Sequence, residues 1–233
     1  MMFDRRVIGA LGIAAGLALG VTTQASATPI LGIELIEAGY STWSTTSSTD
    51  PLAVVVKNFG TFKTNVEVNT LVTDPLSIDL SSTDVSTSTA GTLTIIASAT
   101  GLTTPIGLTG FLSKFTGGFN SGVTSTSLKT YISNSNTMFG TDTLLNTLIA
   151  SGDPWSASGT NSTTTSSPFA ITEVVTITTS GKATINFDGL VAATGAIAAA
   201  PEIDAGSGTA AIALLLGVLG LVSERRRRTP AIA

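Results

Sequence analysis

Cysteine and histidine are both absent from the 233 residues of this sequence. The absence of Cys excludes disulfides, thiolate metal sites, Cys nucleophiles and a lipid-modified cysteine anchor. The absence of His removes the commonest general base and the commonest transition-metal ligand, so a Ser-His-Asp triad is excluded too. A folded domain in this chain must therefore rely on its apolar core and its backbone hydrogen bonds.

Charged residues are also scarce, at 11% of the chain, and all six Arg lie near its two ends. The central segment, residues 28–190, contains five Lys and eleven Asp or Glu, which gives it a net charge of −6. Nucleic-acid binding needs a basic surface that neutralises phosphates. We therefore expect no nucleic-acid partner.

Residues 1–27 have the pattern of a secretory signal peptide. Arg5 and Arg6 precede an uncharged run over residues 7–21, which as a helix is about 22 Å long and too short for the ~30 Å hydrocarbon core. We expect signal peptidase to cut after residue 27; a retained anchor and a twin-arginine signal are the alternatives. The cleavage site comprises Ala25, Ala27 and Thr28.

The C-terminal segment has the pattern of a membrane anchor. Residues 205–222 carry no charge, and as a helix they span about 27 Å. The basic cluster behind this run places the tail on the cytoplasmic side by the positive-inside rule, with the exported body outside. We therefore expect helices at about 6–24 and 205–226. The stop-transfer cluster is Arg225, Arg226, Arg227 and Arg228.

The motif, apolar run and Arg cluster over residues 201–228 together resemble the PEP-CTERM sorting signal. The motif is Pro201, Glu202, Ile203 and Asp204, with Ala200 before it, and it is closer to the Val-Pro-Glu-Ile-Asp variant. The resemblance implies recognition by an exosortase, cleavage near the motif, and a setting of exopolysaccharide and biofilm in a Gram-negative bacterium. A tail anchor that is never processed is the alternative.

The body between these ends has the composition of a β-protein. Ser and Thr make up more than a third of residues 28–190, and Thr favours strands because its branched Cβ suits a pleated sheet. Short apolar or alternating runs recur between polar turns, without a long helical period. We predict an all-β fold, an antiparallel β-sandwich of jelly-roll or Ig-like topology. The expected strands cover 33–37, 52–56, 66–72, 93–97, 128–132, 171–179 and 183–187.

Several polar stretches are predicted to lie between strands. The Ser/Thr tract over residues 156–167 is expected to be a loop, and residues 191–200 an Ala-rich spacer before the sorting signal. Gly117-Gly118 and Asp188-Gly189 are expected to be turns, as is Asp153-Pro154. Ser180-Gly181-Lys182 is expected to close a hairpin. Residues 143–150 are expected to form either a helical turn or a strand.

No group of residues has the pattern of a catalytic site. The acids considered for polysaccharide hydrolysis are Asp74, Asp79, Asp84, Asp142, Asp153 and Glu173, and substitution of Asp142 or Glu173 is the test. Most of these acids are expected to be turn residues, and isolated acids without an aromatic cluster make poor sugar-cleaving sites. Trp43 and Trp155 are expected to plug the core or a loop rather than to stack on sugars. Calcium is the one metal considered, although no dense acidic loop is present. We predict no catalytic residue, no metal site and no cofactor.

The body is also similar to the β-rich domains that often precede PEP-CTERM tails, a similarity carried by residues 131–141 and 171–177. We expect a non-enzymatic protein of the cell surface or extracellular matrix that is first anchored in the inner membrane. Its expected partners are signal peptidase, an exosortase and extracellular polysaccharide. A glycan- or calcium-binding surface module is the first alternative, and a matrix polysaccharide hydrolase is the second.

Overall fold

The computed structural model describes residues 28–49, 52–72 and 75–196. These residues form twelve strands, and none of them lies in a helix. The predicted all-β class is therefore correct for this part of the chain. The helices expected at 6–24 and 205–226 lie outside the described residues, and within the described ranges no helix is long and apolar enough to cross a membrane.

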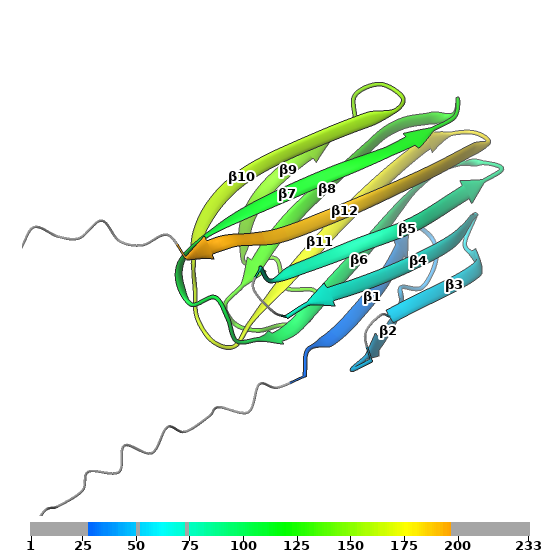
Figure 1. The fold of residues 1–233 in the computed structure, drawn as a ribbon. Helices are drawn as coiled ribbons and strands as arrows, with labels where there is room; N and C mark the ends of the chain where they lie inside the picture. The colour runs from blue at the N-terminus through cyan, green and yellow to red at the C-terminus, as the bar shows by residue number, and fades with distance from the viewer. Residues whose placement is uncertain (1–27, 50–51, 73–74, 197–233) are drawn as a thin grey trace, which may run out of the picture.

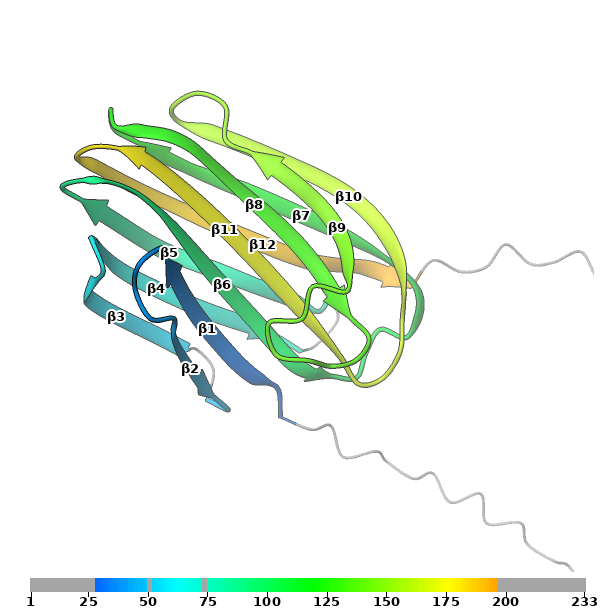
Figure 2. The ribbon, with the colours of Figure 1, turned by 180° about the vertical axis from the view of Figure 1, so that it is seen from behind.

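The strands form two antiparallel six-stranded sheets that face each other (Figures 1 and 2), which confirms the predicted β-sandwich. We call the two layers sheet A and sheet B. Sheet A has the order β2-β1-β6-β11-β8-β9. Its strands are β1 (Ile30–Glu37), β2 (Trp43–Ser47), β6 (Ala90–Leu102), β8 (Val123–Ser133), β9 (Thr143–Ile149) and β11 (Phe169–Ser180).

Sheet B has the order β10-β7-β12-β5-β4-β3. From β5 onward most connections cross from one sheet to the other, so the two layers are joined at both ends of the sandwich. The strands of sheet B are β3 (Leu52–Phe59), β4 (Phe62–Leu71), β5 (Ser77–Thr87), β7 (Gly107–Phe119), β10 (Trp155–Thr165) and β12 (Ala183–Ala196).

The core lies between the sheets, because one side of each strand is apolar. Alternate residues of β12 are buried and exposed along most of its length, as a strand with one face on the core requires. Full burial of a Leu, Ile or Phe side chain contributes about 1.5–3 kcal/mol. The Phe115 ring packs against Phe187 and Trp155, with centroids 5.8 and 5.5 Å away. Trp155 is buried and Trp43 packs against the core, as predicted.

Most of the Ser/Thr tract, residues 156–165, is a strand rather than the predicted loop. β10 pairs with β7 along its whole length, from Trp155 opposite Gly117 to Thr165 opposite Gly107. The sequence shows no apolar alternation here because β10 is an edge strand and most of its side chains are exposed. Its Thr content suits a strand, but tertiary pairing decides the structure.

Other local predictions were also wrong. The segment 180–182 does connect two strands, but β11 and β12 belong to different sheets, so they form no hairpin. Gly117-Gly118 lies within β7 and Asp188-Gly189 lies at a bulge within β12, so neither is a turn. β12 also continues to Ala196, so residues 191–196 are strand rather than spacer.

Two predictions in this part of the chain were right. Residues 143–149 form β9, the strand alternative of the two considered. The Asp153-Pro154 pair lies between β9 and β10, in the polar connection that was expected there, and its peptide bond is cis.

Candidate functional site

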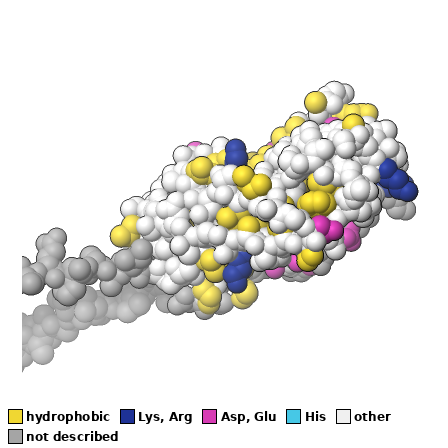
Figure 3. Space-filling model, turned by 90° about the horizontal axis from the view of Figure 1, so that it is seen from above, with side chains coloured by type: hydrophobic (Ala, Val, Ile, Leu, Met, Phe, Trp, Pro, Cys, Tyr) yellow, Lys and Arg dark blue, Asp and Glu magenta, His cyan; other side chains and the backbone are white. Residues whose placement is uncertain are grey.

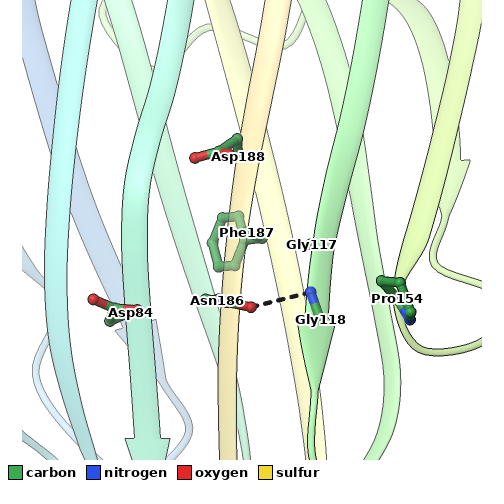
Figure 4. A pocket seen from close by; sticks show the side chains of 7 residues that line it. All are labelled: Asp84, Gly117, Gly118, Pro154, Asn186, Phe187 and Asp188. Atoms are coloured by element: carbon green, nitrogen blue, oxygen red, sulfur yellow. Dashed lines mark hydrogen bonds between the residues drawn. The ribbon is translucent and has the colours of Figure 1, made fainter.

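The outer face of sheet B carries a groove of about 520 Å³. It lies over β5, β12 and β7, and the segment before β10 closes one side (Figure 4). Its lining is polar, apart from Pro154 and the backbone around Phe187, whose ring points into the core. The residues that line it are Asp84, Gly117, Gly118, Pro154, Asn186, Phe187 and Asp188.

Strand register places the groove residues in one row across the sheet. Asn186 on β12 lies opposite Asp84 on β5 and opposite Gly118 on β7. Asn65 on β4 continues the row beyond Asp84. The Gly118 backbone N–H donates a hydrogen bond of 3.1 Å to Asn186 Oδ1 (Figure 4), which fixes the orientation of the amide. The row therefore presents a carboxylate and an oriented amide side by side.

Two glycines make the floor of the groove. At Gly118 the side chain would point outward, and its absence leaves the groove open; a Cβ there would lie 3.0 Å from Asp153 Oδ1. Asp153 in turn accepts a hydrogen bond of 3.0 Å from the Phe119 N–H. At Gly117 a Cβ would point inward, where the Trp155 ring occupies the space. A flat backbone floor of this kind lets a ligand approach closely.

A second, smaller hollow of about 220 Å³ lies on the same face, toward the end where β12 begins. Lys63 on β4 and Lys182 just before β12 both line it, together with Ser and Thr hydroxyls. Lys63 and Thr184 flank Ser86 in the row next to that of Asn186. This hollow combines cationic and hydroxyl groups, so it can hold an anionic group.

The acids of the outer face influence one another. Partial burial raises the pKa of Asp79 on β5, and the negative charges of Asp188 and Glu67 raise it further. Asn69 donates hydrogen bonds to Glu67 at 3.2 Å and to Ser81 at 2.7 Å, next to this cluster. Within the described residues, no group of three or more acids is arranged to hold a metal ion.

Glu173, one of the two acids chosen for the substitution test of catalysis, lies in the core between the sheets. Burial raises the pKa of Glu173 well above its ordinary value, and the charge of Asp79 adds to the effect. The Val191 backbone amide has a smaller opposite influence, and neither carboxyl oxygen has a partner at hydrogen-bonding distance and angle. Solvent does not reach this side chain.

Asp142, the other acid chosen for that test, lies on the surface in the connection between β8 and β9. Its Oδ2 accepts hydrogen bonds from the hydroxyls of Ser133 and Ser135, at 2.8 and 2.9 Å. These bonds stabilise the carboxylate and hold the pKa of Asp142 below its ordinary value. An acid with a lowered pKa makes a poor proton donor, and Asp142 does not line the groove.

The predicted sorting and processing residues fall largely outside the described part of the chain. Thr28 is described and lies exposed just before β1. Of the groove residues, Asp84 was among the acids considered from the sequence, but Asn186 was not and Gly118 was expected to be a turn. The groove itself was not predicted, because Asp84, Asn186 and Gly118 lie on three separate strands. The remaining predicted site residues, Ala25, Ala27, Pro201, Glu202, Ile203, Asp204 and Arg225, Arg226, Arg227 and Arg228, are not described.

Residues 200–229 match the family model of the VPEID-CTERM protein sorting domain. The chain carries a VPEID-CTERM sorting domain. The predicted identity of the C-terminal signal is thus confirmed, and a VPEID-CTERM sorting domain is consistent with an exported, surface-directed protein. No curated protein matches the chain.

Two solved structures show distant similarity to the chain. One is TmCBM61 in complex with beta-1,4-galactotriose, with 10% identity and a TM-score of 0.32 over 58% of this chain and 89% of that one. The other comes from a study of carbohydrate-binding modules of the beta-sandwich superfamily, with 12% identity and a TM-score of 0.28 over 68% and 70%. TM-scores this low give no information about what this chain binds.

Proposed function

We propose that this protein is a non-enzymatic, surface-directed module that binds polysaccharide along the outer face of sheet B. This proposal rests on the groove of about 520 Å³ over Asp84, Asn186 and Asp188. Sugar hydroxyls donate hydrogen bonds to carboxylates and both donate to and accept from amides, and the row across the sheet provides both groups. The glycine floor leaves room for a sugar ring to lie flat.

The second hollow extends the proposed site toward an anionic group. Lys63 and Lys182 line it together with Thr and Ser hydroxyls. Lys63 lies in the row next to that of Asp84 and Asn186. One extended chain can therefore contact both hollows if it carries hydroxyls and, at intervals, a carboxylate. An acidic polysaccharide fits this arrangement better than a neutral one.

Affinity electrophoresis tests the site, with gellan, which carries one carboxylate in each four-sugar repeat, as the acidic polysaccharide and dextran as the neutral one. We expect gellan to retard the protein, and Asn186→Ala and Lys63→Ala each to weaken retardation about five- to tenfold, the effect of one lost polar contact. Lys129→Ala and Glu34→Gln are matched controls on sheet A. If all four variants are retarded equally, or if the wild type is not retarded at all, the groove is not the binding site.

The VPEID-CTERM domain supports a transient membrane anchor that an exosortase removes. The intact mass and location of the protein in its host, with and without the exosortase, test this step. We expect a species from Thr28 to about Pro201 at the surface or in the matrix when the exosortase is present. If Arg225 to Arg228 persist in the inner membrane of both strains, the protein is instead a permanent tail-anchored domain.

We propose no catalytic activity. The burial of Glu173 and the hydrogen bonds from two serines to Asp142 support this, because neither acid is presented to a substrate as a proton donor. Incubation of the protein with gellan, followed by assay for new reducing ends, is the direct test. Release of reducing ends that stops in Asp84→Asn would make the groove an active site.

A further inference from the structure

We propose that the end of the sandwich from which β12 emerges docks onto a lipid surface while the protein is held by its tail. This rests on the anchoring step of the proposed function. The observation behind it is the distribution of exposed apolar side chains. Eight large apolar residues are exposed in the described part of the chain, and six of them lie toward this end, which we call the apolar end. They are Ile30, Leu71, Val72, Ile106, Leu108 and Leu144.

Strand register shows that these residues share one end. β12 finishes beside the start of β7, where Ala196 pairs with Thr109. Leu71, the last residue of β4, pairs with Ser77 at the start of β5, and Ser77 pairs with Ala192 near the end of β12. In sheet A, the first residue of β1, Ile30, pairs with Thr100 near the end of β6. In sheet B, β7 and β4 are three strand positions apart, with β12 and β5 between them. At about 4.8 Å between neighbouring strands, the distance from β7 to β4 is only about 15 Å.

The apolar side chains lie in the loops and strand ends rather than in the core. The six are between 45% and 59% exposed, and Ile106 is 58% exposed in the connection between β6 and β7. Figure 3 shows apolar side chains near the place where the grey segments leave the molecule. A soluble surface has scattered single hydrophobic residues, but here most of them gather on the side where the chain continues to its tail.

The charge of the apolar end also suits a lipid surface. In the described parts of the connections at this end, Asp142 is the one charged residue, and two serines hold its carboxylate. Asp50 and Asp74 belong to two of these connections but lie outside the described residues. The second hollow, which Lys63 and Lys182 line, is at the opposite end, where β4 and β12 begin. Apolar contact rather than attraction to anionic lipid therefore drives docking.

The length of the tail permits the contact. The uncharged run begins at residue 205, nine residues after the last residue of β12. Nine residues reach at most about 30 Å, whereas the far end of the sandwich is about 40 Å further away along strands of 12–14 residues. A chain anchored through this run therefore holds the apolar end next to the bilayer.

Site-specific labelling tests the proposal, and the absence of Cys makes every introduced thiol unique. Leu71→Cys and Ile106→Cys report on the apolar end. Tyr40→Cys and Ile149→Cys are matched controls of similar exposure, 50% and 65%, toward the other end. Each variant is made in an exporting host without an exosortase, reconstituted in phosphatidylcholine vesicles and labelled with a nitroxide.

We expect oxygen, which concentrates in lipid, to relax the labels at 71 and 106 about two- to fivefold more than those at 40 and 149, as for groups that enter the outer ~5–10 Å of a bilayer. A water-soluble nickel chelate should show the reverse order. If the protein floats with the vesicles but oxygen relaxes the labels equally at all four positions, the docking is overturned and the anchor is not. Protein that does not float overturns the anchor and, with it, the docking.

Discussion

The carboxyl group of Glu173 occupies the space beneath Gly189, so that a Cβ on Gly189 would lie 2.5 Å from Glu173 Oε2. Glu173 belongs to β11 in sheet A and Gly189 to β12 in sheet B. The contact therefore joins the two layers at the point where β12 bulges against β5. The bulge and the glycine together make room for a buried acid.

Gly189→Ala is expected to destabilise the fold by about 1–3 kcal/mol, the usual cost of overpacking a tight core. The Glu173 side chain is fully buried and has little room to move away. Urea denaturation measures the change. In a Glu173→Ala background the same substitution should cost less, because the clashing carboxyl is gone. An equal cost in both backgrounds would show that a contact other than the one with Glu173 makes Gly189 necessary.

Glu173→Gln is expected to raise the stability of the protein at neutral pH. Burial raises the pKa of Glu173 in the folded state above its unfolded value of about 4.5. The folded state therefore binds a proton that the unfolded state releases, and stability falls as pH rises from about 4.5 toward the folded pKa. Each pKa unit in this interval corresponds to about 1.4 kcal/mol.

Thermal melts from pH 4 to pH 8 measure this effect. The variant should melt above the wild type at pH 8, and the two should converge near pH 4. Asp79→Asn is a useful control, because burial and neighbouring charges raise the pKa of Asp79 as well and its contribution has the same sign. If the melting temperatures of the wild type and the Glu173→Gln variant differ by the same amount at every pH, Glu173 is already charged in the core.

Asp142→Asn is expected to show the opposite pH dependence. Hydrogen bonds from Ser133 and Ser135 lower the pKa of Asp142 in the folded state. The stability that they provide is present above the unfolded pKa of about 3.8 and is lost as pH falls through the folded value. The variant should therefore melt below the wild type at pH 7, and the difference should shrink as pH falls below about 3.8 toward the folded value. A difference that persists at low pH would point to a cause other than ionisation.

Gly117→Ala is expected to destabilise the sandwich and to displace Trp155. The added methyl group would meet the Trp155 ring and the Asn186 backbone oxygen, and overpacking of this kind costs about 1–3 kcal/mol. A shift of the tryptophan emission maximum reports the displacement. Gly181→Ala is the matched control, since nothing lies within 4 Å of the position of its Cβ. If both variants melt together, Trp155 has more room than the structure shows.

The amino-acid sequence by itself determined the fold class and the sorting signal. Both depend on local properties: alternating Thr, Val and Ile favour strands, and the C-terminal motif, apolar run and Arg cluster are contiguous in residues 201–228. The identity of that signal needed no tertiary contact, because the signal is a linear pattern.

Tertiary structure alone decided the rest. β10 is a strand because β7 provides its hydrogen-bond partners, although its own side chains are mostly polar and exposed. Asp84, Asn186 and Gly118 form a groove only because three strands align in register. Glu173 looks like any other acid in a strand, and only the packing of the two sheets buries it. Pairing between distant strands leaves no local pattern, so neither the register nor the groove can be read from the residues along the chain.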